Sequence, residues 1–218
     1  MNKIFTALLV AAATFSMNAA NASVVTVSTS QSQFDAGTLN QGWWATGAGH
    51  SAYTSNSNTY MGVLGGDVLR SFYTFDLSNI KGNIVGATFR MTAGAGAGST
   101  VNLGLWDVTS DAKTVNANID KNAAIYADLG SGINYGNYVI TTPSSIEKKL
   151  TLNAQALKDL NATLKYFTIG AAVNSGQFLF SSTGANFLDL EVSEIPEPTS
   201  LALLGLGLAC LLPRRRKS

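Results

Sequence analysis

The chain has very few of the residues that build disulfides or metal sites. Among its 218 residues there is one cysteine, Cys210, and one histidine, His50. A lone cysteine cannot form an internal disulfide, and this pair falls short of the four ligands of a structural zinc site. We therefore expect no metal or other cofactor. A hydrophobic core must hold the fold together, which a domain of about 170 residues can bury without covalent cross-links.

Charge is also scarce and unevenly placed. Asp, Glu, Lys and Arg make up 12% of the chain, whose net charge is +1. Lys3 and the four basic residues at 214–217 lie at the two ends, which leaves nine basic and twelve acidic residues between 23 and 194. The middle of the chain is thus mildly acidic. Phosphate binding needs clustered Lys and Arg, so we expect no nucleic acid as a partner.

The common catalytic motifs are missing. There is no Gly-x-Ser-x-Gly elbow, and the glycine-rich stretch 93–98 lacks the Gly-Lys-Ser/Thr of a phosphate loop, so we expect it to connect two strands. His50 lies in a polar, glycine-rich loop. Asp76 and Asp107 follow aromatic residues and are expected to cap turns. The chain is therefore predicted not to be an enzyme; a glycoside hydrolase is the third hypothesis, and a calcium site built from separate loops stays open.

The N-terminus has the three parts of a secretory signal peptide. Lys3 supplies the positive charge, residues 4–13 form a short apolar stretch, and Ala20 and Ala22 are the small residues of a cleavage site. We predict cleavage between Ala22 and Ser23, by a signal peptidase after passage through the Sec translocon. An apolar stretch of about ten residues is too short for a permanent membrane span.

The C-terminus combines a proline-rich joint, an uncharged run at 199–212 and a basic cluster. Prolines prevent a helix from continuing through the joint, and the positive charges place their end of the predicted transmembrane helix on the cytoplasmic side. The run has about 14 residues, whereas a full span needs roughly 20, so it suits a temporary hold. The alternative, a buried core helix, would carry a polar face, and this run has none. The joint is Pro196, Glu197 and Pro198, and the basic cluster is Arg214, Arg215, Arg216 and Lys217.

This order of features resembles the PEP-CTERM protein-sorting signal of Gram-negative bacteria. The resemblance implies that an exosortase-type membrane transpeptidase recognises the Pro-Glu-Pro joint. It also implies transient passage through the inner membrane, followed by delivery to the cell surface or to the extracellular matrix of a biofilm.

Between the two ends, short segments with alternating apolar residues predict many β-strands separated by turns. In 71–77, Phe72, Thr74 and Asp76 are expected on one face and Tyr73, Phe75 and Leu77 on the other. One segment differs, because Asn153 can cap a helix in which Ala156, Leu157, Leu160 and Leu164 have helical spacing. The predicted strands are 24–28, 71–77, 84–91, 101–106, 138–141, 146–152, 166–173, 177–180 and 187–192, and in 84–91 the residues Val85, Ala87, Phe89 and Met91 are expected to share a face.

The middle of the chain also resembles the jelly-roll modules of anchored bacterial surface proteins, which are similar to carbohydrate-binding domains. The residues that carry this resemblance are RSFYTFDLS at 70–78 and IVGATFRM at 84–91. The expected fold is mostly β, an antiparallel β-sandwich (jelly-roll-like) with one short helix, flanked by a signal helix and a transmembrane helix. The expected parts are a signal peptide at 1–22, the β-sandwich ectodomain at 23–194 and the sorting segment at 195–218.

We expect the ectodomain to be a structural or adhesive protein without catalytic activity. The alternative is a carbohydrate-binding module that contacts exopolysaccharide, because aromatic rings offer flat faces for sugars and the surrounding Asn and Ser can bind hydroxyls. Trp43 and Trp44 are adjacent, so on a strand one ring would point inward and the other outward. Trp106 is expected in the core. The candidate glycan-binding residues are Trp43, Trp44, Tyr53 and Tyr60.

Overall fold

The computed structural model of the chain describes residues 22–30, 34, 39–47, 58–96, 100–117, 119, 121–141, 146–163, 165–181 and 184–193. The predicted signal helix, sorting motif, transmembrane helix and basic cluster lie outside these residues, as do His50 and Tyr53. Within the described ranges, no helix is long and apolar enough to span a membrane.

Most of the described chain is β-strand, as the sequence predicts. The strands are β1 (Ala22–Ser28), β2 (Gln41–Ala45), β3 (Thr59–Leu64), β4 (Asp67–Asp76), β5 (Asn83–Gly96), β6 (Thr100–Asp107), β7 (Asn134–Thr141), β8 (Glu147–Thr151), β9 (Tyr166–Val173), β10 (Phe178–Ser181) and β11 (Phe187–Ser193), and the helices are α1 (Ala112–Val115), α2 (Ala123–Asp128) and α3 (Ala154–Ala162).

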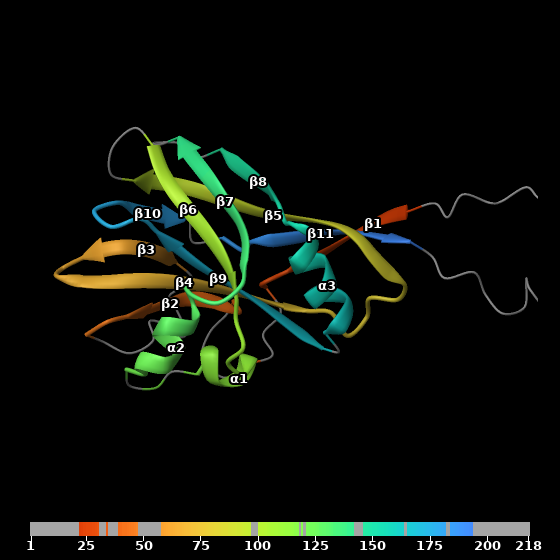
Figure 1. The fold of residues 1–218 in the computed structure, drawn as a ribbon, viewed down its shortest axis with the longest axis horizontal. Helices are drawn as coiled ribbons and strands as arrows, with labels where there is room; N and C mark the ends of the chain where they lie inside the picture. The colour runs from red at the N-terminus through yellow and green to blue at the C-terminus, as the bar shows by residue number, and fades with distance from the viewer. Residues whose placement is uncertain are drawn as a thin grey trace, which may run out of the picture.

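The strands form two antiparallel layers (Figure 1). In the first layer the order is β1-β11-β5-β8. The second contains β4-β9-β6-β7, with β2 and the β3–β4 hairpin added at β4. The long strand β5 joins the layers, because its second half pairs with β10, which in turn pairs with β3.

The main core lies between the layers and follows from the alternation of side chains along each strand. In β4, Tyr73 and Phe75 point into this core, whereas Phe72 and Thr74 point to the other face of the sheet, as predicted. The rings of Tyr73 and Phe89 pack at 4.7 Å between centroids across the two layers.

One predicted face is wrong at the start of β5. Val85 was expected to share a face with Ala87, Phe89 and Met91, which are buried, but it is 45% exposed, and its neighbour Ile84 is buried. The register shifts at this point, since Glu191 of β11 pairs with Gly86 but Val192 pairs with Ile84. Val85 is therefore an extra residue in a β-bulge, and such a residue reverses the alternation locally.

The predicted helix is confirmed as α3. The Asn153 side chain accepts hydrogen bonds from the backbone N–H groups of Gln155 and Ala156, and Ala156 and Leu160 join the main core. The prediction of a single helix is wrong, because α1 and α2 also form, capped by Asp111 and Asn122. They have four and six residues, too few to show a helical period in the sequence.

Strands β2 and β3 were not predicted, because the region around Trp43 and Trp44 shows no alternation. The structure explains this for β2, in which Trp43 is partly buried and the other four residues are buried. One face of β2 turns towards the side of the main core, and α1 and α2 cover the other. A strand that is covered on both faces has no polar side to alternate with.

A second, smaller core lies between the second layer and these two helices. Trp44 is its largest member, fully buried, and its indole Nε1 donates a 3.0 Å hydrogen bond to the backbone oxygen of Val115. The ring and its bond therefore fix α1 against the sheet. The members are Trp44, Phe72, Val115, Ile125 and Leu129.

Substitution of Trp44 tests this second core. We expect Trp44→Ala to lower the free energy of unfolding by about 3–5 kcal/mol, because a large cavity forms between the sheet and the helices. Trp44→Phe keeps a ring but loses the bond to Val115, and the lost bond is worth about 1 kcal/mol. Equilibrium urea unfolding measures both values; a loss below about 1 kcal/mol for Trp44→Ala would show that the helices do not enclose the ring.

Candidate functional site

The two ends of the described domain lie side by side. β1 pairs with β11 along its whole length, and the pairs at the end are Ala22 with Ser193 and Ser23 with Val192 (Figure 1). Ala22 and Ser23, the predicted cleavage residues, are exposed. The predicted cleavage site and Ser193, the last described residue before the sorting segment, thus lie at one end of the domain. Ala20, Pro196, Glu197, Pro198, Arg214, Arg215, Arg216 and Lys217 lie outside the described residues.

The candidate glycan residues do not form one site. Trp43 and Trp44 point to opposite faces of β2, as the sequence predicts, but Trp44 is the buried ring under α1 and α2. The faces of the Trp44 ring are therefore inaccessible to a glycan, and the prediction that Trp44 contacts one is wrong. Trp43 is partly buried and lies opposite Ser71 of the neighbouring strand β4. Tyr60 is partly buried on β3, and Tyr53 lies outside the described residues.

Tyr60 belongs instead to a row of three aromatic rings with Phe178 and Phe180, which we call the aromatic row. Phe180 pairs directly with Tyr60, and the ring centroids of Tyr60 lie 6.0 Å from Phe178 and 5.2 Å from Phe180. All three are partly exposed, whereas Leu179 between the two phenylalanines is fully buried. The row therefore lies on the outer face of β3 and β10, where ring faces and edges can meet a ligand.

The aromatic row lies far from the terminal strands. In Figure 1, β10 and β3 occupy the end of the molecule opposite to the start of β1 and the finish of β11. The two phenylalanines were missed as site residues, although the sequence Phe178-Leu179-Phe180 carries a usable signal. With Leu179 assigned to the core, alternation places both rings on the outer face.

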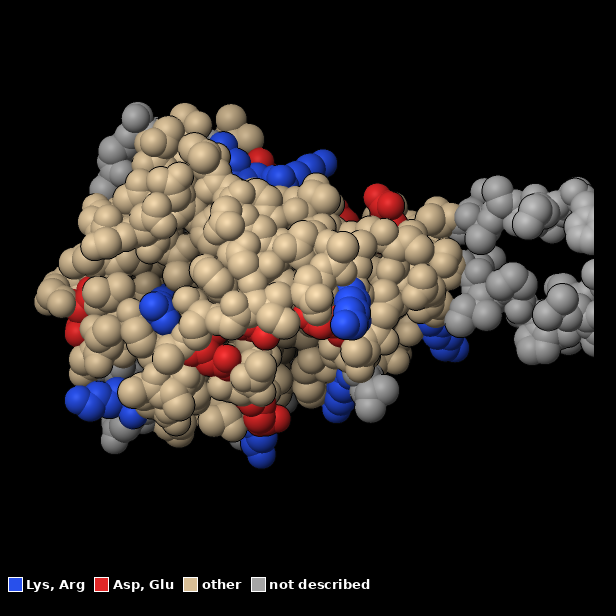
Figure 2. Space-filling view, viewed as in Figure 1, with Lys and Arg blue, Asp and Glu red and all other residues tan. Residues whose placement is uncertain are grey.

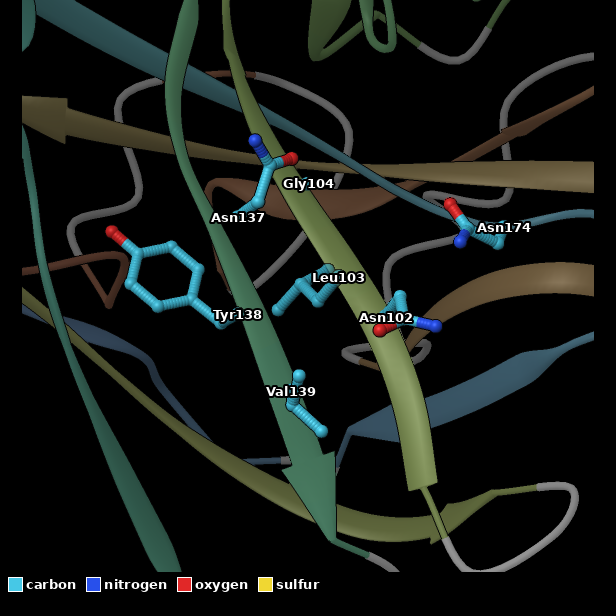
Figure 3. Close-up of a pocket in the computed structure, with 7 residues that line it drawn as sticks. All are labelled: Asn102, Leu103, Gly104, Asn137, Tyr138, Val139 and Asn174. Atoms are coloured by element: carbon cyan, nitrogen blue, oxygen red, sulfur yellow. The ribbon is translucent and has the colours of Figure 1, made fainter.

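An open pocket of about 270 Å³ lies over β6 and β7 (Figure 3). It displays the amides of Asn102, Asn137 and Asn174, but these groups do not converge on one point. Asn137 is already engaged with Asn134 through reciprocal amide bonds of 3.0 and 3.2 Å. The Tyr138 ring turns to the other side of β7, where its hydroxyl donates to the backbone oxygen of Thr151. The pocket therefore offers no convergent set of polar groups to a ligand.

Trp106 lies near this pocket. It was predicted to lie in the core, and this prediction is wrong. Val101, Leu103 and Leu105 of β6 are buried, so alternation places Trp106 on the outer face, where it is partly exposed. The indole lies across Gly104, where a Cβ atom would be 2.8 Å from Nε1. Among the described residues this buried Nε1 has no hydrogen-bond partner.

Two carboxylates share a cleft of about 260 Å³ between β6, β7, β9 and α3. Asp107, the last residue of β6, accepts a 2.6 Å hydrogen bond from the backbone N–H of Ile133, which precedes β7. It therefore links two neighbouring strands, and the prediction that it caps a turn is wrong. Asp159 accepts bonds from the Tyr135 hydroxyl at 3.0 Å and from Gln155 at 2.9 Å. Asp76 likewise accepts from the backbone N–H of Ser78. These oxygens are engaged in holding the fold.

Burial raises the pKa of Asp107, and the negative charges of Asp128 and Asp159 add to the effect, while the Ile133 N–H opposes it. Burial also raises the pKa of the Tyr135 hydroxyl, with a further contribution from Asp159. Within the described residues, no group of three His, Cys, Asp or Glu side chains is suited to hold a metal ion.

The raised pKa of Asp107 makes a contribution to stability that depends on pH. A carboxyl with a raised folded-state pKa stabilises the fold fully below its unfolded value of 3.8, and this stabilisation is lost as the pH rises through the folded value. Asp107→Asn keeps an acceptor for Ile133 but cannot ionise. We therefore expect the variant to gain stability relative to the wild type as the pH increases from 3.8. Urea unfolding across that range measures the difference; a constant difference would contradict the shift.

The comparisons with known proteins bear on the C-terminal segment. Residues 194–217 match the model of the PEP-CTERM protein-sorting motif. No curated protein matches the chain. The motif implies export, membrane-associated sorting to the cell surface and processing by exosortase, a membrane enzyme. The C-terminal segment of the chain thus carries the PEP-CTERM protein-sorting motif.

Proposed function

We propose that residues 23–194 form a structural or adhesive domain of the cell surface or extracellular matrix, without catalytic activity. The observation that carries this proposal is the pairing of Ser23 with Val192, which places the two ends of the described domain side by side. Removal of the signal peptide at 1–22 and processing of the sorting segment at 195–218 would therefore leave the core unchanged. The opposite end, with the aromatic row, is then directed away from the attachment point (Figure 1).

The strand order supports a jelly-roll module. If β1, β4, β5, β6, β7, β8, β9 and β11 are numbered 1 to 8 in chain order, the layers contain 1-8-3-6 and 2-7-4-5. This is the order of an eight-stranded jelly roll, an architecture that occurs in lectin and capsid domains. The fold by itself assigns no function, so the proposal depends on the surfaces that the fold presents.

The acidic cleft supports a role without catalysis. A glycoside hydrolase needs one carboxyl group to donate a proton and another to act on the sugar or on water. Asp107 and Asp159 instead receive hydrogen bonds from Ile133, Tyr135 and Gln155 of their own chain. The arrangement stabilises the junction of β6, β7 and α3.

A second candidate function is glycan binding, and the aromatic row favours it. Three rings on neighbouring strands form a short apolar platform, and sugar rings stack their C–H faces on such platforms. We propose this platform as the contact surface in place of Trp43 and Trp44. Of the candidates from the sequence, Tyr60 remains part of it. The ligand would be a neutral or weakly charged exopolysaccharide, because the row itself carries no charge.

Binding of the signal-free full chain to exopolysaccharide tests this candidate. We expect Tyr60→Ala or Phe178→Ala to weaken binding by about 1–2 kcal/mol, a factor of about 5–30, because each removes one stacking face. Phe187→Ala is the matched control, since this partly buried ring lies on β11 beside Arg90. Affinity electrophoresis or calorimetry measures the change. Equal binding by all variants would remove the aromatic row as the site.

Processing of the tail has a separate test. In a host that carries an exosortase, we expect the protein recovered from the cell surface to lack residues 214–217, as shown by its intact mass. The double variant Pro196→Ala with Pro198→Ala should leave the full-length chain in the membrane fraction, because exosortase would no longer recognise the altered Pro-Glu-Pro joint. Pro143→Ala, a proline outside the motif, serves as the control. A surface form that retains residues 214–217 would contradict processing.

A further inference from the structure

The first strand of the domain is an edge strand without the usual protection. β1 pairs with β11 on one side, and no described residue pairs with its other side. Native edge strands are commonly blocked by charged residues, proline, a bulge or short length. β1 has seven residues, Ala-Ser-Val-Val-Thr-Val-Ser, with no charge or proline, and its register with β11 is continuous.

The other strands with one described partner differ from β1. β8 carries Glu147, Lys148 and Lys149, so charge protects it. β7 is bulged opposite Leu105 and Trp106, and the hydroxyl of its Tyr138 bonds to the end of β8. β2 is largely buried. The uncharged, regular edge is therefore that of β1.

Apolar side chains are exposed along this edge on both faces of the layer. Val24 is 65% exposed on the outer face, and Val25 is 37% exposed on the core face, beside the fully buried Leu190. A strand laid along β1 would cover both valines and would continue the sheet. Exposed β-branched residues on an unprotected edge are typical of strands that pair with another chain.

The hydrogen bonds show which backbone groups face the open side. The N–H of Thr29 donates to the backbone oxygen of Asn186 on the β11 side. Since antiparallel pairing alternates, the N–H groups of Val25 and Val27 also point to β11, and those of Val24 and Thr26 point outward. The open edge thus offers donors and acceptors at the even-numbered residues.

We propose that this edge pairs with β1 of a second copy of the chain, in antiparallel orientation about a twofold axis at Val25. Val24 of each copy then exchanges two backbone hydrogen bonds with Thr26 of the other. The two Val25 side chains face each other in a non-hydrogen-bonded pair, where side chains approach most closely. The contact is isologous, because the same surface serves in both copies.

The self-complementary edge favours a second copy of this chain as the occupant, and charge does not oppose it. No like charges meet within the paired strands, because β1 has none. In the next row, Glu191 of one copy would lie opposite Asp189 of the other across three strand spacings, about 14 Å, which exceeds the Debye length of about 8 Å. Asp189 is also paired with Arg90 at 2.8 Å in its own chain. The two first layers would then form one continuous eight-stranded sheet.

Cysteine cross-linking tests the geometry directly, on the full chain without its signal peptide and with Cys210→Ser. The two Cβ atoms at position 25 would lie within disulfide range across the axis. We therefore expect Val25→Cys to form disulfide-linked dimers several times faster than Val24→Cys. In the proposed dimer, position 24 of one copy lies opposite position 26 of the other, so the two cysteines at position 24 would be two residues out of register. Equal rates would indicate random collision and would overturn the proposal.

An edge variant tests the association without a cross-link. Val24→Pro removes an outward N–H that makes no bond within the domain, so the fold should persist and the dimer should be lost. Val24→Thr keeps this N–H and a β-branched side chain and serves as the control. Sedimentation of the detergent-solubilised full chain measures the association, and urea unfolding checks the fold. A wild-type chain that stays monomeric, or a Val24→Pro dimer as tight as the wild type, would overturn the proposal.

Discussion

The place of β11 between β1 and β5 is the constraint on which the rest of the domain depends. β11 is the last strand, yet it supplies pairing partners to the first strand and to the strand that joins both layers. Its residues Leu188 and Leu190 are fully buried in the main core. The first layer therefore cannot close until the chain has been made as far as Ser193, just before the sorting motif at 194–217. Because Ser23 pairs with Val192, one contact brings the two ends of the described domain together.

This arrangement places the start of β1 and the finish of β11 at one end of the domain and the aromatic row at the other (Figure 1). Charged groups are scattered over the visible face rather than gathered into one patch (Figure 2). The binding surfaces of the domain are accordingly apolar or amide-rich, which suits contact with polysaccharide or with another copy of the chain better than contact with a highly charged partner.

Sequence patterns predicted the parts of the fold in which a local signal matches the final environment. The alternating faces of β4 and the Asn153 cap of α3 are such parts, since one depends on a period of two and the other on neighbouring residues. The predictions from these patterns were wrong or missing where contacts with distant segments determine which side chains are buried. β2 is covered on both sides by distant segments, and Val85 faces solvent because of a bulge against β11. Of the candidate site, Tyr60 was identified from sequence, but its neighbours Phe178 and Phe180 are brought beside it by pairing of strands more than 100 residues apart.

The central claim, that β1 closes the domain by pairing with β11, is tested most directly by amide hydrogen exchange of the full chain without its signal peptide, at low protein concentration. The N–H groups of Val25 and Val27 point to β11, so they should exchange slowly. The N–H of Asp189 points to β5 and serves as the reference for a protected amide of β11. The N–H groups of Val24 and Thr26 face outward and should exchange quickly. Fast exchange at Val25 and Val27, with the Asp189 N–H still protected by β5, would show that β1 is not part of the sheet.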